Sequence, residues 1–230
     1  MLDTYCERAG DPGLLAEPIN LITNAAFVIA AAFAASRLAS EPDLGVRNAW
    51  DLGLLVLLLA AIGIGSALWH SFATGWAVLA DVIPITLFIN LYLLSFGWRV
   101  LRLSWLALAG LWLGYQVMSV GLVALAGPEL MNGSIAYLPA LAFLVGFWWV
   151  LNRRADPLAP TLLFACVLFI SSLTFRSLDI ALCRTLPIGL HFLWHLLNAL
   201  LLYLLLRGLI EAHSHSTSVS QSWPDSEVVD

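Results

Sequence analysis

Residues 48–70 read NAWDLGLLVLLLAAIGIGSALWH, an almost unbroken run of apolar residues that ends on a histidine. A helix needs about 20 residues to cross the ~30 Å hydrocarbon core of a bilayer. The run is long enough for one crossing, and its single acidic residue, Asp51, stands near its start. This stretch therefore predicts a membrane-spanning helix.

The same pattern recurs six more times along the 230-residue chain, between charged residues, prolines and glycines. Of all residues, 61% are hydrophobic and 11% are charged, whereas soluble domains have about 45–50% apolar and about 25% charged residues. We therefore predict an all-α fold, a bundle of seven transmembrane helices. The other expected spans lie near residues 18–36, 77–97, 103–126, 135–151, 159–175 and 187–209.

Polar segments stand at both ends of the predicted bundle. The chain closes with HSHSTSVSQSWPDSEVVD, which contains too few apolar residues to order itself. We expect an extracytoplasmic N-terminal segment at 1–17, a seven-helix domain at 18–210 and a disordered cytoplasmic tail at 211–230.

Charge and cysteine content exclude two other classes of protein. The formal net charge is −5, all ten basic residues are arginines, and they form no cluster, which excludes an electrostatic nucleic-acid binder. Three cysteines are too few for a small scaffold built from disulfides.

The arginines predict how the bundle is oriented. In a seven-helix chain the first, third and fifth loops and the C-terminal end share one side of the membrane. Because arginine is enriched on the cytoplasmic side, we place the N-terminus outside and the C-terminus in the cytoplasm. The short loops favour a bacterial inner membrane. The predicted cytoplasmic side carries Arg37, Arg47, Arg99, Arg102, Arg153, Arg154 and Arg207, and the other side Arg8, Arg176 and Arg184.

Ionisable residues are rare in this chain at membrane depth, where they usually mark a functional site. His70 ends the second span, Asp81 begins the third, and His191 and His195 lie in GLHFLWHLLN in the seventh. The orientation above brings all four close to the outer face. His191 and His195 are four residues apart, so they project from one side of their helix.

Three histidines suit a catalytic zinc ion whose fourth position is left to water. Zinc lowers the pKa of such a water to about 7. Asp81 would accept a proton from the water and pass it to a leaving amine. Ser66, one turn before His70, would donate to the oxyanion or orient the carbonyl. These roles predict hydrolysis of an amide or ester inside the membrane.

Each of these residues also has a simpler interpretation. A histidine at the membrane edge can be an interfacial hydrogen-bonding group, and an HxxxH pair can arise by chance. Asp81 can cap the third helix, and Ser66 in GIGSA can serve close helix packing. A shared site is favoured because every histidine at membrane depth falls on one side of the bilayer.

The motifs together resemble the alkaline ceramidase family, part of a wider group of seven-helix hydrolases and receptors that includes adiponectin-receptor-like proteins and haemolysin III. The resemblance covers residues 3 to about 205. It rests on GxGSxxxH ending at His70, DVIP beginning at Asp81 and HxxWH ending at His195, together with YCER, EPINLITN and RSLDIALC.

The resemblance implies that His70, His191 and His195 hold zinc, that Asp81 handles the catalytic water and that Ser66 assists at the carbonyl. It implies a zinc-dependent hydrolase that cleaves the amide bond of ceramide, or of a ceramide-like N-acyl lipid, to a fatty acid and a long-chain amine. The active site would lie near the periplasmic face. The alternative is a seven-helix receptor or membrane-perturbing protein in which the zinc is structural.

The family also implies a calcium ion (Ca²⁺) beside the zinc. Glu7 and Glu17 match its ligands best, with Asp3 and the backbone carbonyl of Tyr5 as further ligands, since calcium prefers oxygen donors. Tyr5 replaces a family tryptophan, the spacing between the two glutamates is shorter, and the family's asparagine ligand aligns with Ala9 or with nothing. The alternative is a solvated acidic face.

Cys6 and Cys183 both fall on the predicted outer side, where an oxidising compartment permits a disulfide. The second of them lies in the family-like run RSLDIALC. We predict a Cys6–Cys183 bridge, with two free thiols as the alternative. In the same run we expect Arg176 and Asp179, three residues apart, to form a local ion pair on a helical face; the alternative is that Asp179 accepts a hydrogen bond from a zinc-ligand imidazole.

Overall fold

The computed structural model of the protein describes residues 5–41 and 49–221. In this part of the chain all regular structure is helical. Seven segments are long and apolar enough to cross a membrane, so the predicted all-α bundle with seven candidate spans is confirmed. The elements are α1 (Pro18–Thr23), α2 (Ala25–Ala39), α3 (Trp50–Phe72), α4 (Gly75–Arg99), α5 (Trp105–Ala126), the 3-10 helix η1 (Ser134–Tyr137), α6 (Leu138–Arg153), α7 (Ala159–Leu182) and α8 (His191–Gln221).

The expected span boundaries hold except around the last two helices. α7 continues to Leu182, about two turns beyond the expected end at residue 175, because its two charged residues find partners inside the protein. α8 runs to Gln221, past the expected domain end at residue 210. Asp3 lies outside the described residues.

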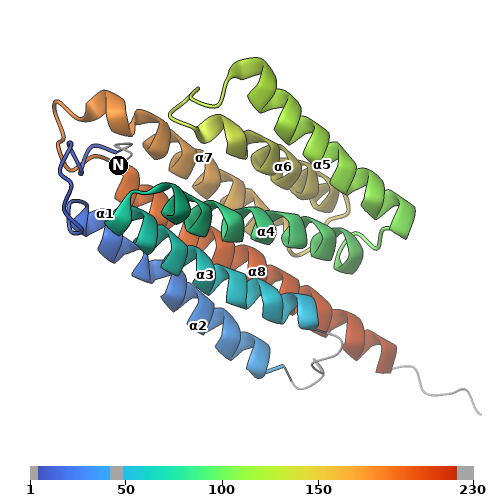
Figure 1. Ribbon diagram of the computed structural model, residues 1–230. Helices are drawn as coiled ribbons and strands as arrows, with labels where there is room; N and C mark the ends of the chain where they lie inside the picture. Colours follow the sequence, from blue (N-terminus) through green and yellow to red (C-terminus); the bar gives the residue numbers. More distant parts are fainter. Residues whose placement is uncertain (1–4, 42–48, 222–230) are drawn as a thin grey trace, which may run out of the picture.

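Successive spans run in alternating directions along a common axis (Figure 1). α8 packs against α2, α3, α4 and α7 and therefore occupies the middle of the bundle. The N-terminal segment, the end of α3, the start of α4, the end of α7 and the start of α8 all lie at one end (Figure 1). The residues predicted for the site are brought to this end, which we call the site end.

The alternation also separates the arginines. Arg8, Arg176 and Arg184 belong to the site end. The opposite end holds the arginines at or just after the ends of α2, α4 and α6, and Arg207 within α8. Arg47 falls outside the described residues. Which end faces the cytoplasm stays a prediction.

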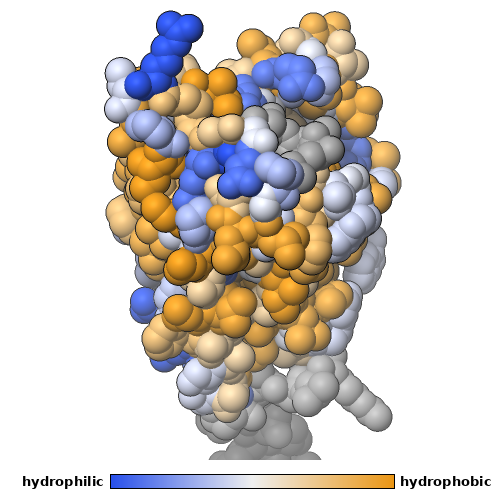
Figure 2. Space-filling model, turned by 60° about the vertical axis from the view of Figure 1, so that its left-hand side comes forward, coloured by the Kyte–Doolittle hydropathy of each residue, from blue (hydrophilic) through white to orange (hydrophobic). Residues whose placement is uncertain are grey.

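Large hydrophobic side chains cover the outside of the bundle, as Figure 2 shows for one face. Leu106 and Leu125 on α5 are 85% and 90% exposed. A soluble protein rarely leaves so much apolar surface in contact with water. The surface is therefore suited to lipid chains.

A buried ion pair joins α3 and α4 at the opposite end of the bundle. Arg99 Nε donates to Asp51 Oδ2 at 2.8 Å, and Ser95 Oγ donates to the same oxygen at 2.8 Å. Arg99 is only 5% exposed and Asp51 only 2%. Arg99 thus links two helices inside the protein, a role that its place among the loop arginines did not indicate.

A close contact between α3 and α4 brings the two motifs GIGS and DVIP together. Pro84 lies inside α4 and has no N–H, so the Ala80 carbonyl one turn earlier lacks its usual helical partner. Gly65 packs against this carbonyl, and a Cβ at Gly65 would collide with the Ala80 oxygen. The glycine therefore allows Ser66, the next residue, to reach Asp81.

Candidate metal centre

Three imidazoles meet at the site end. His70 lies near the C-terminal end of α3, and His191 and His195 lie one turn apart at the start of α8. They are 0%, 2% and 1% exposed, respectively. One ring nitrogen from each lies within 4.8 Å of the others, an arrangement that can hold a metal ion.

A carboxylate on the far side of its ring fixes the tautomer of His70. His70 Nδ1 lies 2.5 Å from Glu17 Oε2. Because an ionised carboxylate only accepts hydrogen bonds, Nδ1 is the donor. In the neutral imidazole the other nitrogen, Nε2, then carries a lone pair.

Thr23 fixes the tautomer of His195 in the same way. The Thr23 hydroxyl has one proton, which it donates to the backbone carbonyl of Ile19 at 2.8 Å or of Asn20 at 3.1 Å. It must therefore accept a hydrogen bond from His195 Nδ1, which lies 2.9 Å away. The lone pair of His195 is thus also on Nε2.

The two lone pairs face each other. His70 Nε2 and His195 Nε2 are 3.1 Å apart, and two facing lone pairs call for a cation between them. His191 Nδ1 is buried and has no hydrogen-bond partner. Converging imidazole nitrogens whose other ring nitrogen is held by an acceptor are typical of zinc sites, so these residues fit the implied metal.

Glu17 belongs to a buried network behind His70. Its Oε1 accepts from Arg8 Nε at 2.6 Å, and its Oε2 accepts from Asn20 Nδ2 at 3.0 Å. Burial raises the pKa of Glu17, but the hydrogen bonds from His70, Asn20 and Arg8 outweigh it and hold the pKa below its ordinary value. Glu17 therefore stays ionised and holds the His70 ring in place.

Arg8 fastens the N-terminal segment over the histidines. Besides its bond to Glu17, its guanidinium donates to the backbone carbonyl of His70 through Nη2 at 2.6 Å and to that of Asp11 through Nη1 at 3.1 Å. Arg8 is 1% exposed. Its positive charge thus lies beside the carboxylate that orients a candidate metal ligand.

Two of the residues predicted for calcium, Glu7 and Glu17, have N–H donors on their carboxylate oxygens, and calcium binding stays a prediction. Both oxygens of Glu7 accept backbone N–H groups, from Ile19 at 2.7 Å and Asn20 at 2.9 Å. Both oxygens of Glu17 accept N–H groups, and the adjacent cation is the Arg8 guanidinium. Glu17 is 3% exposed, whereas Glu7 is half-buried.

Asp81 and Ser66 lie next to the imidazoles. Among the described residues, Asp81 Oδ1 is buried without a hydrogen-bond partner. The Asp81 carboxyl interacts with the Ser66 hydroxyl and electrostatically with His70 and Arg176. α4 begins at Gly75 after Thr74, so Asp81 is nearly two turns inside the helix and does not cap it. The unpartnered oxygen is free to accept a proton from a molecule in the site.

The Cys6–Cys183 disulfide is present, as predicted. The predicted ion pair between Arg176 and Asp179 is wrong. Asp179 accepts from the backbone N–H groups of Cys6 at 3.1 Å and His191 at 3.0 Å, so it holds the start of α8 by its backbone and makes no bond to an imidazole. Arg176 donates to the Tyr5 hydroxyl at 3.1 Å.

Sequence reasoning missed Arg8 and Thr23 altogether and gave Glu17 a different role. Their only signal was position, since they stand in the polar YCER and EPINLITN segments next to the first span. Tyr5, predicted as a backbone calcium ligand, stacks its ring on His191 with 3.7 Å between ring centroids. Burial raises the pKa of the Tyr5 hydroxyl, so the ring stays neutral.

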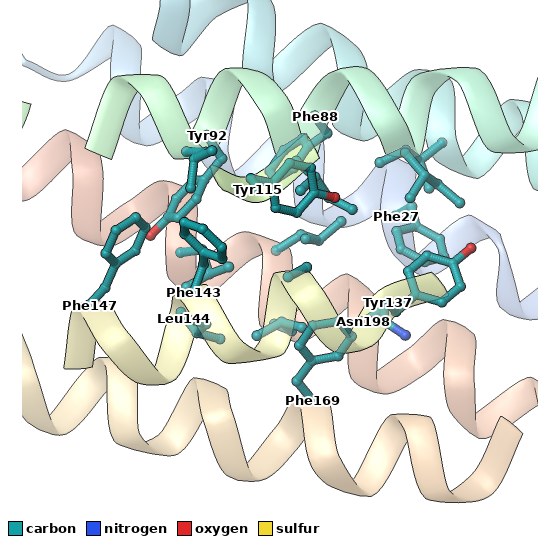
Figure 3. A pocket seen from close by; sticks show the side chains of 18 of the residues that line it. Phe27, Phe88, Tyr92, Tyr115, Tyr137, Phe143, Leu144, Phe147, Phe169 and Asn198 are labelled. Carbon is teal, nitrogen blue, oxygen red and sulfur yellow. The ribbon is translucent and has the colours of Figure 1, made fainter. Parts of the chain in front are cut away.

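An elongated apolar cavity lies inside the bundle, next to the metal centre. Phe27, in its lining, contacts the ring of His195. Figure 3 shows Phe27, Tyr137 and Asn198 toward one end and Tyr92 and Phe147 toward the other. On α8 the lining extends from Trp194 to Leu205, about 16 Å of helix. The apolar lining suits a hydrocarbon chain.

The family model described as Ceramidase matches residues 12–227, nearly the whole chain. No curated protein sequence matched the chain.

Proposed function

The chain belongs to the ceramidase family, and from this premise we propose that it is a zinc-dependent intramembrane hydrolase. Its substrate would be ceramide or a ceramide-like N-acyl lipid, and its products a fatty acid and a long-chain amine. The observation that carries the proposal is the pair of facing Nε2 atoms of His70 and His195 beside the unpartnered Asp81 Oδ1. This pairing provides a metal site and a proton acceptor in one pocket.

When bound, zinc would polarise the carbonyl and lower the pKa of a water to about 7. The residues that would hold it are His70, His191 and His195. Glu17 and Thr23 keep the rings of His70 and His195 in the tautomer that presents Nε2. Hydrogen bonds to the Nδ1 atoms raise the affinity for the metal, because the imidazole rings need not reorient when it binds.

Asp81 accepts the proton of the attacking water as its oxygen bonds to the carbonyl carbon, and gives that proton to the nitrogen as the carbon–nitrogen bond breaks. Ser66, which interacts with the Asp81 carboxyl, orients this carboxyl or the carbonyl oxygen. The apolar cavity receives a lipid chain and keeps bulk water from the reacting groups. In the overall reaction, water and an amide give a carboxylic acid and an amine.

We place the site near the outer, periplasmic face of a bacterial inner membrane. Two observations support this orientation. Of the nine arginines that the structure describes, the site end carries only three, as expected for an external side. It also carries the Cys6–Cys183 disulfide, which forms in an oxidising compartment.

The test is to incubate the purified, zinc-loaded protein with a panel of N-acyl lipids and to measure released fatty acid, with Asp81→Asn as the control. Release that Asp81→Asn abolishes supports the proposal. If the protein contains zinc and unfolds on its removal but releases no fatty acid from any N-acyl or O-acyl lipid, the structural-zinc receptor replaces the enzyme.

A further inference from the structure

Arg176, near the end of α7, makes no ion pair within 4 Å with a carboxylate among the residues that the structure describes, although Asp81 acts on it electrostatically from farther away. Its Nη1 donates to the neutral Tyr5 hydroxyl at 3.1 Å, and its Nε is buried with no partner. Burying a guanidinium inside a membrane protein is costly unless its N–H groups find acceptors. Since no described carboxylate is hydrogen-bonded to Arg176 and its Nε has no acceptor, this guanidinium is a candidate for binding an anionic ligand.

Three aromatic rings surround the guanidinium. Its central carbon lies 5.2 Å from the ring centroid of Trp194, 5.6 Å from that of Tyr137 and 5.8 Å from that of Tyr5. Rings at these distances offset part of the cost of burying the cation. They also fix the guanidinium in one place, so that little freedom is lost when it binds a ligand.

These same rings place Arg176 between the metal centre and the cavity. Tyr5 stacks on His191, and Trp194 precedes His195 in the chain. Trp194 and Tyr137 line the apolar cavity. A lipid whose chain fills the cavity therefore has its polar end at Arg176 and the histidines.

We propose that Arg176 binds the carboxyl end of the acyl chain: the carboxylate of the fatty acid product and, before cleavage, the carbonyl oxygen of the amide. A guanidinium matches a carboxylate with two parallel hydrogen bonds, whereas the amine half offers no anion. The acyl half of the substrate thus lies in the cavity and the amine half lies outside it. This inference rests on the proposed function for the identity of the lipid.

The test measures binding without turnover. The full-length, zinc-loaded protein in detergent is titrated with palmitate and with hexadecanol, which has the same chain length and no charge. The wild type is expected to prefer palmitate. Arg176→Gln is expected to lose about tenfold or more of this preference, as for a hydrogen bond to a charged group, while hexadecanol binds as before. Arg176→Lys retains the charge and is expected to keep part of the preference.

Arg184→Gln is the matched control, because Arg184 is an exposed arginine at the same end of the bundle and its loss is expected to leave the preference unchanged. Zinc content is measured in each variant, so that loss of metal is not mistaken for loss of Arg176. A wild type that does not prefer palmitate, or a zinc-loaded Arg176→Gln that keeps the full preference, overturns the proposal.

The binding test and the hydrolysis test can fail independently of each other. If the protein prefers palmitate through Arg176 but cleaves no lipid, the fatty-acid site is supported and the proposed hydrolase activity is contradicted. If the protein cleaves ceramide but its Arg176→Gln variant keeps the preference for palmitate, the hydrolase activity is supported and the role of Arg176 is contradicted. If Arg176→Gln does not fold, the wild type and Arg176→Lys still decide the matter.

Discussion

The Nε2 atoms of His70 and His195 face each other at 3.1 Å although the two residues are 125 positions apart in the chain. The Nδ1 atom of each ring is hydrogen-bonded, to Glu17 in His70 and to Thr23 in His195. Both acceptors belong to the short stretch EPINLITN around α1. This stretch therefore orients two candidate ligands that come from different helices.

Replacing Glu17 is expected to weaken metal binding without removing a ligand. Glu17→Gln keeps an oxygen acceptor for His70 Nδ1 but loses the negative charge, and it removes the ion pair between Arg8 and Glu17. Loss of such a group behind a metal ligand usually costs 10–100-fold in affinity or activity. Competition with a zinc chelator measures the affinity. Glu129→Gln, on an exposed loop, is the control, and equal affinities for the two variants would contradict the assigned role.

Asp81→Asn is expected to retain zinc and to lose hydrolysis. The amide cannot accept the proton of the water, and general acid–base groups contribute typically 10²–10⁴-fold to rate. Metal content by elemental analysis and fatty acid release are measured on the same sample. Retained metal with a rate within a few-fold of the wild type would mean that another group moves the proton.

Chelators are expected to distinguish the two implied metals. A calcium-selective chelator should leave activity unchanged, since the oxygens of Glu7 and Glu17 are engaged by N–H donors and Arg8 supplies the positive charge. Removal of zinc should abolish activity, and added zinc should restore it. Activity that falls when calcium alone is withdrawn would show that the N-terminal segment rearranges to bind it.

The sequence allowed the histidines and Asp81 to be predicted because ionisable residues stand out within apolar spans. Arg8 and Thr23 could not be recognised in this way, since polar residues are ordinary in a segment outside the membrane. Their partners lie far away in sequence: Arg8 bonds the carbonyl of His70, and Thr23 bonds His195.

Local spacing misled the prediction for Arg176 and Asp179. An i, i+3 pair of opposite charge usually interacts along a helix. Here the start of α8 presents unpaired backbone N–H groups that Asp179 accepts, and Arg176 turns to three aromatic rings. Tertiary contacts at the junction of α7 and α8 thus replaced the local pair, and spacing alone does not reveal them.

The Arg99–Asp51 pair is expected to be a main determinant of stability at the end opposite the site. Arg99→Leu leaves a buried carboxylate uncompensated, which costs about 3–5 kcal/mol. The double variant Arg99→Leu/Asp51→Leu removes both charges and is expected to recover most of this loss. Unfolding in detergent, monitored by circular dichroism, measures both. A double variant no more stable than the single one would show that the pair is not coupled as its distances indicate.

Gly65 is expected to tolerate no side chain, because its neighbour is backbone rather than a movable side chain. Gly65→Ala places a methyl group against the Ala80 carbonyl, so α3 and α4 must separate. Such overpacking costs about 1–3 kcal/mol, and it moves Ser66 away from Asp81, so activity should fall more than zinc content. Gly53→Ala in the same helix is the matched control. A Cβ at Gly53 meets no heavy atom within 4 Å, and alanine is the better helix former, so this variant should be as stable as the wild type or more so. Equal behaviour of the two alanine variants would show that the close approach of α3 and α4 at Gly65 does not position the candidate proton acceptor.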